Sequence, residues 1–152
     1  MGMIKVPEIS LKYFRKNMKK IFDTGNLAEG KWNQMLADYI KEMTGAQTAI
    51  PTNSNGAGLV ALMTIYRNYF DRINVMIQSN TMYGVKTMVP TAGCNLNGYI
   101  NCKLETLMPS YSDVKDSIDK INKSEREKQI ILLSHIGGII NPEIEKIATL
   151  CK

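Results

Sequence analysis

The sequence predicts an α/β fold with a mostly parallel sheet and flanking helices. Two short apolar runs, Ile73–Gln78 and Gln129–Ser134, have the composition of buried strands. Segments with helical periodicity, about 10–15 residues long, alternate with the predicted strands, and this alternation is typical of a parallel sheet. The chain of 152 residues is long enough to bury a sizeable core.

The first predicted element is a helix that Ser10 caps and that runs to about Phe22. The segment Thr24–Gly30 is rich in turn-forming residues and follows this helix directly. We expect residues 1–30 to form an N-terminal helix-and-turn segment. Residues 31–152 are then expected to form the α/β core.

A second helix is predicted after this turn, and Gly45 is expected to end it. A short extended run, Gln47–Pro51, precedes the loop Thr52–Gly58, and a third helix is expected to begin near Ala57. The second helix is predicted from apolar residues at helical spacing, namely Trp32, Met35, Leu36, Tyr39, Ile40 and Met43. The third has the same spacing at Leu59, Leu62, Met63, Tyr66, Tyr69 and Phe70.

The middle of the chain alternates between predicted strands and a short helix. The strand Ile73–Gln78 precedes a helix over Thr81–Thr91, which Ala92–Gly93 closes. Weaker strand patterns lie at Gly98–Asn101 and at Lys103–Met108.

The last part of the chain predicts a helix, a strand and a final helix. Ser112 is expected to cap a helix that runs to Ile121. The strand Gln129–Ser134 follows, and Asn141 as N-cap with Pro142 at the first helical position opens the last helix. Because an alternating series of this kind continues with another parallel strand, we expect a truncated core, the N-terminal part of a larger domain.

The composition excludes several classes of protein. Hydrophobic residues at 44% and charged residues at 22% exclude a disordered tail, a collagen-like repeat and a disulfide scaffold. The sequence has no apolar run of the roughly 18–20 residues that a membrane span needs, and its N-terminus does not resemble a signal peptide. With three cysteines and one histidine, we expect reduced thiols, no metal site and a cytoplasmic protein.

The net charge of +5 comes from the first 20 residues, where Glu8 is the single acidic residue. A basic segment can bind nucleic acid or an acidic membrane. Here the charges alternate with apolar residues at helical spacing, so we interpret them as the solvated face of an amphipathic helix and expect neither a nucleic-acid nor a membrane partner. The basic residues are Lys5, Lys12, Arg15, Lys16, Lys19 and Lys20.

Two motif matches lack the context that their chemistry needs. Gly25–Lys31 fits G-x-x-x-x-G-K, but Trp32 stands where a P-loop has Ser or Thr, and a helix rather than a strand precedes it. Ser112–Lys115 fits S-x-x-K without its Lys-Thr-Gly partner, and Ser112 is better explained as a helix cap. Neither match predicts a function.

The loop Thr52–Gly58 has two interpretations. Small residues between an apolar run and a helix let the backbone approach a ligand, and free N–H groups at a helix N-terminus bind phosphate. Ser54 and Asn55 can add side-chain donors to such a site. The same residues also fit an ordinary Asn/Ser/Gly turn with a helix cap.

His135 follows the strand Gln129–Ser134 and precedes Gly137–Gly138. This position is the carboxyl end of a strand, where ligands gather in open α/β sheets. No carboxylate or cysteine lies near it in the sequence, so a structural histidine is the alternative.

Several segments, in this order, resemble the N-terminal half of the DegT/DnrJ/EryC1/StrS aminotransferases, pyridoxal-phosphate enzymes that aminate nucleotide-linked keto-sugars. The resemblance covers essentially the whole chain. The segments are Val6–Ser10, Asp23–Leu27 with Glu29-Gly30, Ser54–Leu59, Ser79–Met82, Ala92-Gly93, Ser134–Gly138 and Asn141–Cys151.

The resemblance implies part of a fold-type-I aminotransferase large domain, in which the sheet holds pyridoxal 5'-phosphate. Ser54, Asn55 and Gly56 would receive the phosphate of the cofactor, and Met82 would stack on its pyridine ring. Met82 stands where the family places an aromatic residue, and a thioether covers a ring face less well. Asn55-Gly56 replaces Gly-Thr of the family pattern and loses one hydroxyl donor.

The resemblance also implies which residues lie near the substrate. Thr24, Asn26 and Leu27 would lie near a nucleotide-sugar substrate and the partner of a homodimer. Thr81 and His135 would line the same site.

The family's catalytic groups have no counterpart in this sequence. The resemblance implies an aspartate that pairs with the pyridinium nitrogen and a lysine that forms the Schiff base, and PLP chemistry needs both. Lys86, Lys103, Lys128 and Lys146 stand in no matching context.

Three hypotheses for the function follow. The chain can be a truncated or split aminotransferase, inactive alone and completed by a C-terminal half. It can instead be a non-catalytic binding or oligomerisation module derived from that fold. The third hypothesis is an unrelated α/β domain that binds another phosphate-bearing ligand.

Overall fold

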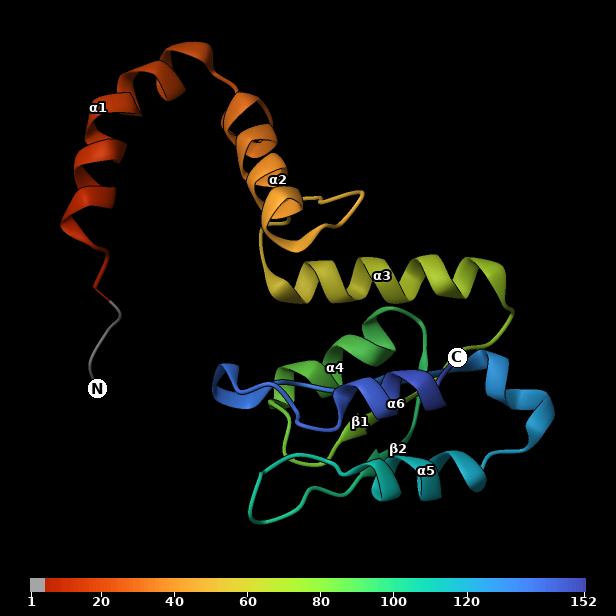
Figure 1. Ribbon diagram of the computed structural model, residues 1–152. Coiled ribbons are helices and arrows are strands. Elements are labelled where there is room, and N and C mark those ends of the chain that lie inside the picture. The colour runs from red at the N-terminus through yellow and green to blue at the C-terminus, as the bar shows by residue number, and fades with distance from the viewer. Residues whose placement is uncertain (1–4) are drawn as a thin grey trace. The chain divides into compact units, whose positions relative to one another are not determined.

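The computed structural model describes residues 5–152 (Figure 1), in which contacts separate two compact units. The first unit ends at Pro51 and the second is Thr52–Lys152. The division at residue 30 that the sequence suggests stays a prediction. The elements are α1 (Glu8–Thr24), α2 (Lys31–Thr44), α3 (Asn55–Tyr69), β1 (Asn74–Gln78), α4 (Tyr83–Thr91), β2 (Asn95–Ile100), α5 (Tyr111–Asp119), η1 (Lys123–Lys128), β3 (Gln129–Leu132), η2 (Ile136–Gly138) and α6 (Ile144–Leu150).

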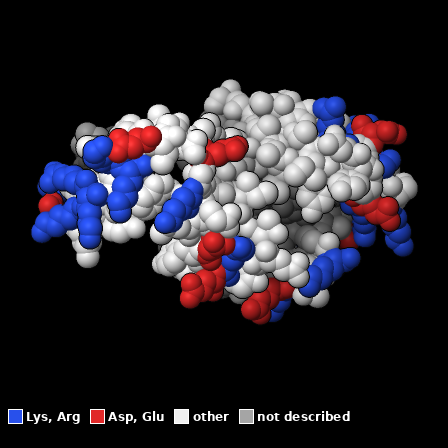
Figure 2. Space-filling model, turned by 90° about the horizontal axis from the view of Figure 1, so that it is seen from above, with Lys and Arg blue, Asp and Glu red and all other residues white. Residues whose placement is uncertain are grey.

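The first unit contains the helices α1 and α2, and each ends at a glycine in the left-handed conformation. Gly25 has φ 67° and Gly45 has φ 71°, a conformation that costs glycine least. The sequence prediction that Gly45 ends the second helix is confirmed. The basic side chains of α1 gather on its surface (Figure 2).

The cap predicted at Ser10 is wrong. Pro7 precedes α1, and its carbonyl oxygen accepts hydrogen bonds from the N–H groups of Ser10 and Leu11 at 3.0 and 3.1 Å. The ring of Pro7 fixes its φ and removes a donor that would be unpaired at this helix end. Ser10 therefore lies inside the first turn of α1 rather than in front of it.

The extended run predicted at Gln47–Pro51 forms no strand. A strand needs a partner for its backbone groups, and the sheet described in residues 5–152 does not include this segment. Ile50 is 79% exposed, so its apolar side chain adds no burial here.

The second unit contains a parallel sheet of three strands in the order β2-β1-β3. The α/β class with a parallel sheet, which the sequence predicts, is confirmed. β1 lies in the centre, where Val75 and Ile77 are almost completely buried. The ladder between β1 and β3 runs from Asn74↔Gln129 to Ile77↔Leu132 and ends there.

Helices cover both faces of this sheet. Val75 and Ile77 of β1 pack with α3 and α4 in one core cluster that includes Met63 and Val89. The other cluster holds Ile100, Val114 and Ile147, with α5 and α6. Successive strand residues point to opposite faces, so burial on both faces explains the near-continuous apolar runs.

Cys94 belongs to the first of these clusters and is 5% exposed. Burial raises the pKa of its thiol, which keeps the side chain uncharged. Cys94 therefore packs as a small hydrophobic residue.

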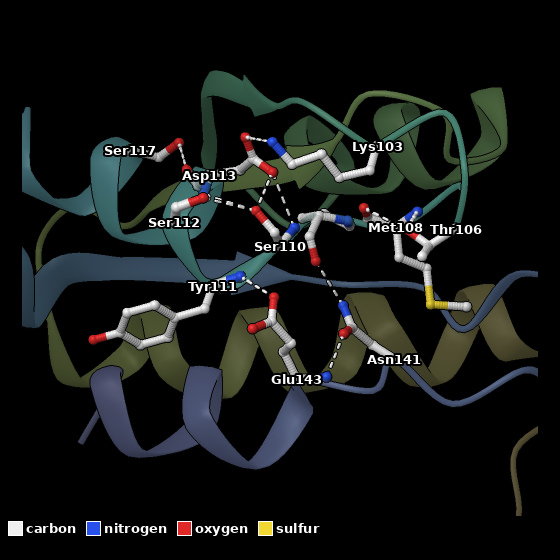
Figure 3. A network of polar contacts seen from close by, with 11 residues as sticks. Lys103, Thr106, Met108, Ser110, Tyr111, Ser112, Asp113, Ser117, Asn141 and Glu143 are labelled. Carbon is white, nitrogen blue, oxygen red and sulfur yellow. Dashed lines mark hydrogen bonds and ion pairs between the residues drawn. The ribbon is translucent and has the colours of Figure 1, made fainter.

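The turn before α5 and the start of α5 differ from the sequence predictions (Figure 3). Lys103–Met108 is a turn and not a strand, because the N–H of Lys103 donates to the carbonyl of Met108 at 3.0 Å. The N-cap of α5 is Ser110 rather than Ser112. The carboxylate of Asp113 accepts from the backbone N–H of Ser110 at 3.0 Å, and Ser110 Oγ accepts from the N–H of Asp113 at 3.3 Å, which completes a capping box.

The last helix begins later than predicted, at Ile144, and Asn141 serves the turn before it. Asn141 Oδ1 accepts from the N–H of Glu143 at 2.9 Å, and its Nδ2 donates to the carbonyl of Pro109 at 2.8 Å (Figure 3). Glu143 in turn accepts from the N–H of Tyr111 at 2.9 Å, the first N–H of α5. This long-range pairing joins the start of α5 to the residue directly before α6.

The helix predicted near Ala57 begins two residues earlier, at Asn55. Ser54 is its N-cap, with Oγ accepting from the N–H of Ala57 at 3.1 Å. Asn55 and Gly56 therefore form the first turn of α3.

Candidate functional site

A cleft of about 580 Å³ opens at the carboxyl ends of β1 and β3, beside the first residues of α3 and α4. This volume lies in the range typical of small-molecule sites. Four residues that the sequence singles out line it, namely Asn55, Thr81, Met82 and His135. The structure thus brings together residues that are up to 80 positions apart in the sequence.

The N-terminus of α3 forms one wall of the cleft. Ser54 caps the helix, and the N–H of Gly58 donates to its carbonyl at 3.2 Å. The N–H groups of Asn55 and Gly56 have no acceptor within the described residues 5–152. Free N–H groups at the positive end of a helix dipole favour an anion at this wall.

Gly56 lies close to the end of the Met88 side chain. A Cβ built at this position would lie 2.6 Å from the Cε atom of Met88, so the space that a side chain would take belongs to the methionine methyl group. Gly56 of α3 and Met88 of α4 are therefore close neighbours. Of the three residues predicted to receive a phosphate, Asn55 lines the cleft, and Ser54 and Gly56 flank it in the chain.

The second wall is formed by the segments that follow β1. Met82 is the residue directly before α4, and its side chain is 73% exposed, so its thioether is free to contact a ligand. Thr81 Oγ1 lies 3.0 Å from Ser134 Oγ, and this hydroxyl pair crosses from the β1 side of the cleft to the β3 side.

His135 lies on the β3 side. Its Nδ1 accepts from the N–H of Asn141 at 3.2 Å. Because Nδ1 is the acceptor, the proton of the neutral ring is on Nε2. His135 therefore brings one N–H donor to the lining of the cleft.

Sequence reasoning missed a polar cluster at the same edge of the sheet. Gln78 is the last residue of β1 and is 1% exposed. Its Oε1 accepts from the N–H of Ser134 at 2.9 Å, and its Nε2 donates to Asn80 Oδ1 at 2.9 Å. The sequence did hold a signal for this cluster, because Gln78 is a polar residue at the end of an apolar run, where the carboxyl edge of a parallel sheet is expected.

Asn80 extends this cluster to the segment that follows β2. Its Oδ1 also accepts from Cys102 Sγ at 3.1 Å, and its Nδ2 donates to the carbonyl of Leu107 at 2.7 Å. Leu107 has a φ of 57°, which is uncommon for a residue with a side chain. Asn80 therefore links the cleft to the turn that precedes α5.

The cleft lining contains neither a lysine nor a carboxylate among the described residues. His135 is its one titratable side chain there. The described part of the chain also has no group of three His, Cys, Asp or Glu side chains placed to hold a metal ion.

Thr24, Asn26 and Leu27, which the family resemblance implies to lie near a substrate, belong to the first unit. Thr24 and Asn26 line a cavity of about 340 Å³ there, next to the edge-to-face ring pair of Tyr13 and Trp32. Leu27 is 64% exposed. Their role beside a substrate stays a prediction.

The fold and the cleft define a class of protein, an α/β protein with a cleft at the carboxyl ends of parallel strands, where ligands commonly bind in such folds. The sequence profile of the DegT/DnrJ/EryC1/StrS aminotransferase family matches residues 10–152. The chain therefore belongs to this family, whose members are PLP-dependent. No curated protein and no solved structure gives a significant match to the chain. In residues 5–152, none of the helices combines the length and apolar character that crossing a bilayer requires.

Proposed function

We propose that this chain is the cofactor-binding half of a truncated or split PLP-dependent aminotransferase that acts on nucleotide-linked keto-sugars in the cytoplasm. The observation that carries the proposal is the cleft, where Asn55, Thr81, Met82 and His135 meet in a chain of this family. The proposal includes a partner, either a second copy of the chain or a complementing C-terminal half.

The phosphate end of pyridoxal phosphate fits the residues that are present. The unpaired N–H groups of Asn55 and Gly56 and the hydroxyl of Ser54 are the donors that a phosphate dianion needs. Ser54 Oγ accepts from Ala57, so its own proton remains available for donation; its present acceptor, Asn53 Oδ1, is 3.4 Å away. The exposed thioether of Met82 is placed to cover one face of the ring.

The cleft does not supply the two groups that the catalytic end of the cofactor needs. The cofactor supplies an electron sink when its ring nitrogen is paired with a carboxylate, and a lysine amine anchors it. The described lining of the cleft has neither group. We infer that both come from the complementing polypeptide, and that the chain alone is inactive as a transaminase.

Substitution of Ser54 tests the phosphate site. A charge-assisted hydrogen bond is worth about 1.5–3 kcal/mol, so Ser54→Ala should weaken the binding of pyridoxal phosphate by about tenfold or more. Binding is measured by calorimetry. Ser110→Ala is the matched control, because Ser110 also caps a helix through its Oγ, but its helix α5 contributes no residue to the cleft lining, whereas α3 contributes Asn55.

An equal loss of affinity in Ser54→Ala and Ser110→Ala would show that the loss of a cap, and not the loss of a phosphate contact, lowers the affinity. Unchanged affinity in Ser54→Ala would exclude the proposed phosphate site.

Borohydride reduction tests the missing lysine. After incubation with pyridoxal phosphate, reduction and peptide mapping, we expect low, scattered labelling over the exposed lysines. Stoichiometric labelling of one defined lysine would contradict the proposed need for a complementing half. If the chain binds pyridoxal phosphate and its native host makes no complementing polypeptide, the hypothesis of a non-catalytic module is favoured.

A further inference from the structure

Gln78 is a buried amide in the middle of the sheet edge that faces the cleft. It ends the central strand β1 and is 1% exposed, next to the equally buried and apolar Ile77. Both of its polar atoms are paired, Oε1 with the N–H of Ser134 and Nε2 with Asn80 Oδ1. Because a backbone N–H can only donate, the contact with Ser134 fixes which way the amide lies.

The backbone ladder stops before the cleft. The last pair between β1 and β3 is Ile77↔Leu132, so Gln78 has no ladder partner on β3. Beyond this pair, the segments that follow β1 and β3 lie on two sides of the cleft. The first leads to Thr81 and the second to His135. The Gln78 amide and the Thr81–Ser134 hydroxyl pair are the side-chain hydrogen bonds that join the two segments beyond the ladder in the described structure.

We propose that Gln78 is a positioning residue, which sets the spacing across the cleft between Thr81 and His135. It touches neither the cleft nor its ligand and acts through Ser134 and Asn80, the neighbours of those two residues in the chain. That the ligand is a pyridoxal phosphate rests on the proposed function. The hydrogen bonds by which Gln78 joins the two segments do not depend on the proposed function.

The role requires one group that accepts and donates at the same time. An amide does both, a protonated carboxyl does both, an ionised carboxylate only accepts, and leucine does neither. Gln78→Glu should therefore behave like the native chain where the new carboxyl is protonated. Burial raises the pKa of that carboxyl. Above this pKa, the second carboxylate oxygen has no proton to donate to Asn80 Oδ1, so the hydrogen bond to Asn80 is lost.

The experiment compares the full chain with Gln78→Glu, Gln78→Leu and Gln129→Leu. Gln129 begins β3 at the opposite end of the same ladder and makes its side-chain hydrogen bonds to Asn97 and Ile130, so it is a matched Gln→Leu control away from the cleft. Two quantities are measured, the exchange protection of the Ser134 amide without ligand and the dissociation constant of pyridoxal phosphate. Each constant is divided by the native value at the same pH, which removes the pH dependence that the variant and native chains share.

We expect Gln78→Leu to lower the protection of Ser134 about tenfold or more and to weaken binding to a similar extent. Gln129→Leu should leave both quantities within about twofold of native. The affinity ratio of Gln78→Glu should approach one at low pH and fall as pH rises, an effect that a general loss of stability does not produce.

A pH-independent ratio for Gln78→Glu, or equal losses of Ser134 protection in the two leucine variants, would overturn the positioning role. If even the native chain binds no pyridoxal phosphate, the proposed function fails. The ligand-free exchange of Ser134 in Gln78→Leu against Gln129→Leu then still decides whether Gln78 ties the two segments.

Discussion

The helical unit that ends at Pro51 and the α/β unit Thr52–Lys152 differ in how they use their apolar residues. In the described part of the first unit, Asn17 and Ala37 are the buried residues, and large side chains such as Phe22 and Leu36 are more than half exposed. In the second unit, both faces of the sheet are covered, and Val75, Val89 and Ile100 are completely buried.

The difference shows that a helix and a core have separate physical requirements. α1 and α2 follow from amphipathic spacing and from glycines that stop each helix, which are signals within a few residues. The core of the second unit needs β1, β2 and β3 to pair, and the last pairing joins segments more than 50 residues apart. We therefore expect substitutions in the two units to have unequal effects on stability.

The largest effect is expected from Ile77→Ala. Ile77 is 1% exposed in the central strand, and truncating such a residue costs about 2–5 kcal/mol of unfolding free energy. The same change at Ile9, which is 78% exposed on α1, should stay within about 0.5 kcal/mol. Urea unfolding followed by circular dichroism measures both. Similar losses at the two positions would refute the contrast between the units.

A smaller and local effect is expected from Gly45→Ala. Gly45 has φ 71° and nothing within 4 Å of the position of an added Cβ, so the cost is the backbone strain of about 1–2 kcal/mol. Amide hydrogen exchange should increase in Lys31–Thr44 and remain unchanged in Asn74–Gln78. Gly45→Asn should cost less, since asparagine tolerates this conformation. Faster exchange in both segments would mean that the two units unfold together.

The smallest effect concerns the dependence of the second unit on pH. The hydrogen bond from Ser110, together with Lys103, lowers the pKa of Asp113 below its usual value. The ionised form therefore stabilises the folded state above the unfolded pKa of about 3.9, and this stabilisation is lost as pH falls through the lowered folded pKa. Asp113→Asn should be less stable by about 1 kcal/mol near pH 7 and lose less stability on acidification.

Unfolding curves from about pH 6 to pH 2 check this expectation. Asp116→Asn is the control, because the side chain of Asp116, on the same helix, makes no hydrogen bond or ion pair among the described residues. If both variants have the same pH dependence, the capping box at Ser110 does not carry the effect.

The candidate site was partly predictable. Asn55, Thr81, Met82 and His135 stand out in the sequence through loop composition, strand ends and family resemblance, and the structure places all four on one cleft. Their binding roles remain predictions. Gln78, Asn80 and Ser134 did not stand out, because their partners lie on other segments.

Corrections to the predicted elements have the same origin. Ser112 and Ser110 are both good cap residues, and the choice between them came from Asp113 and from Glu143, which accepts from the N–H of Tyr111 across the α5–α6 contact. The run Gln47–Pro51 has strand-like composition and lacks a partner strand in the described sheet.

The sequence by itself determined the α/β class, the strands predicted at Ile73–Gln78 and Gln129–Ser134 to within two residues at each end, and the glycine that ends α2. These features depend on periodicity and backbone freedom, which act within a few residues. The tertiary structure alone decided that the amide of Gln78 meets the N–H of Ser134, 56 positions away, and which side chains share the cleft. A hydrogen bond acts over about 3 Å, and only the folding of the sheet brings such distant groups within that range.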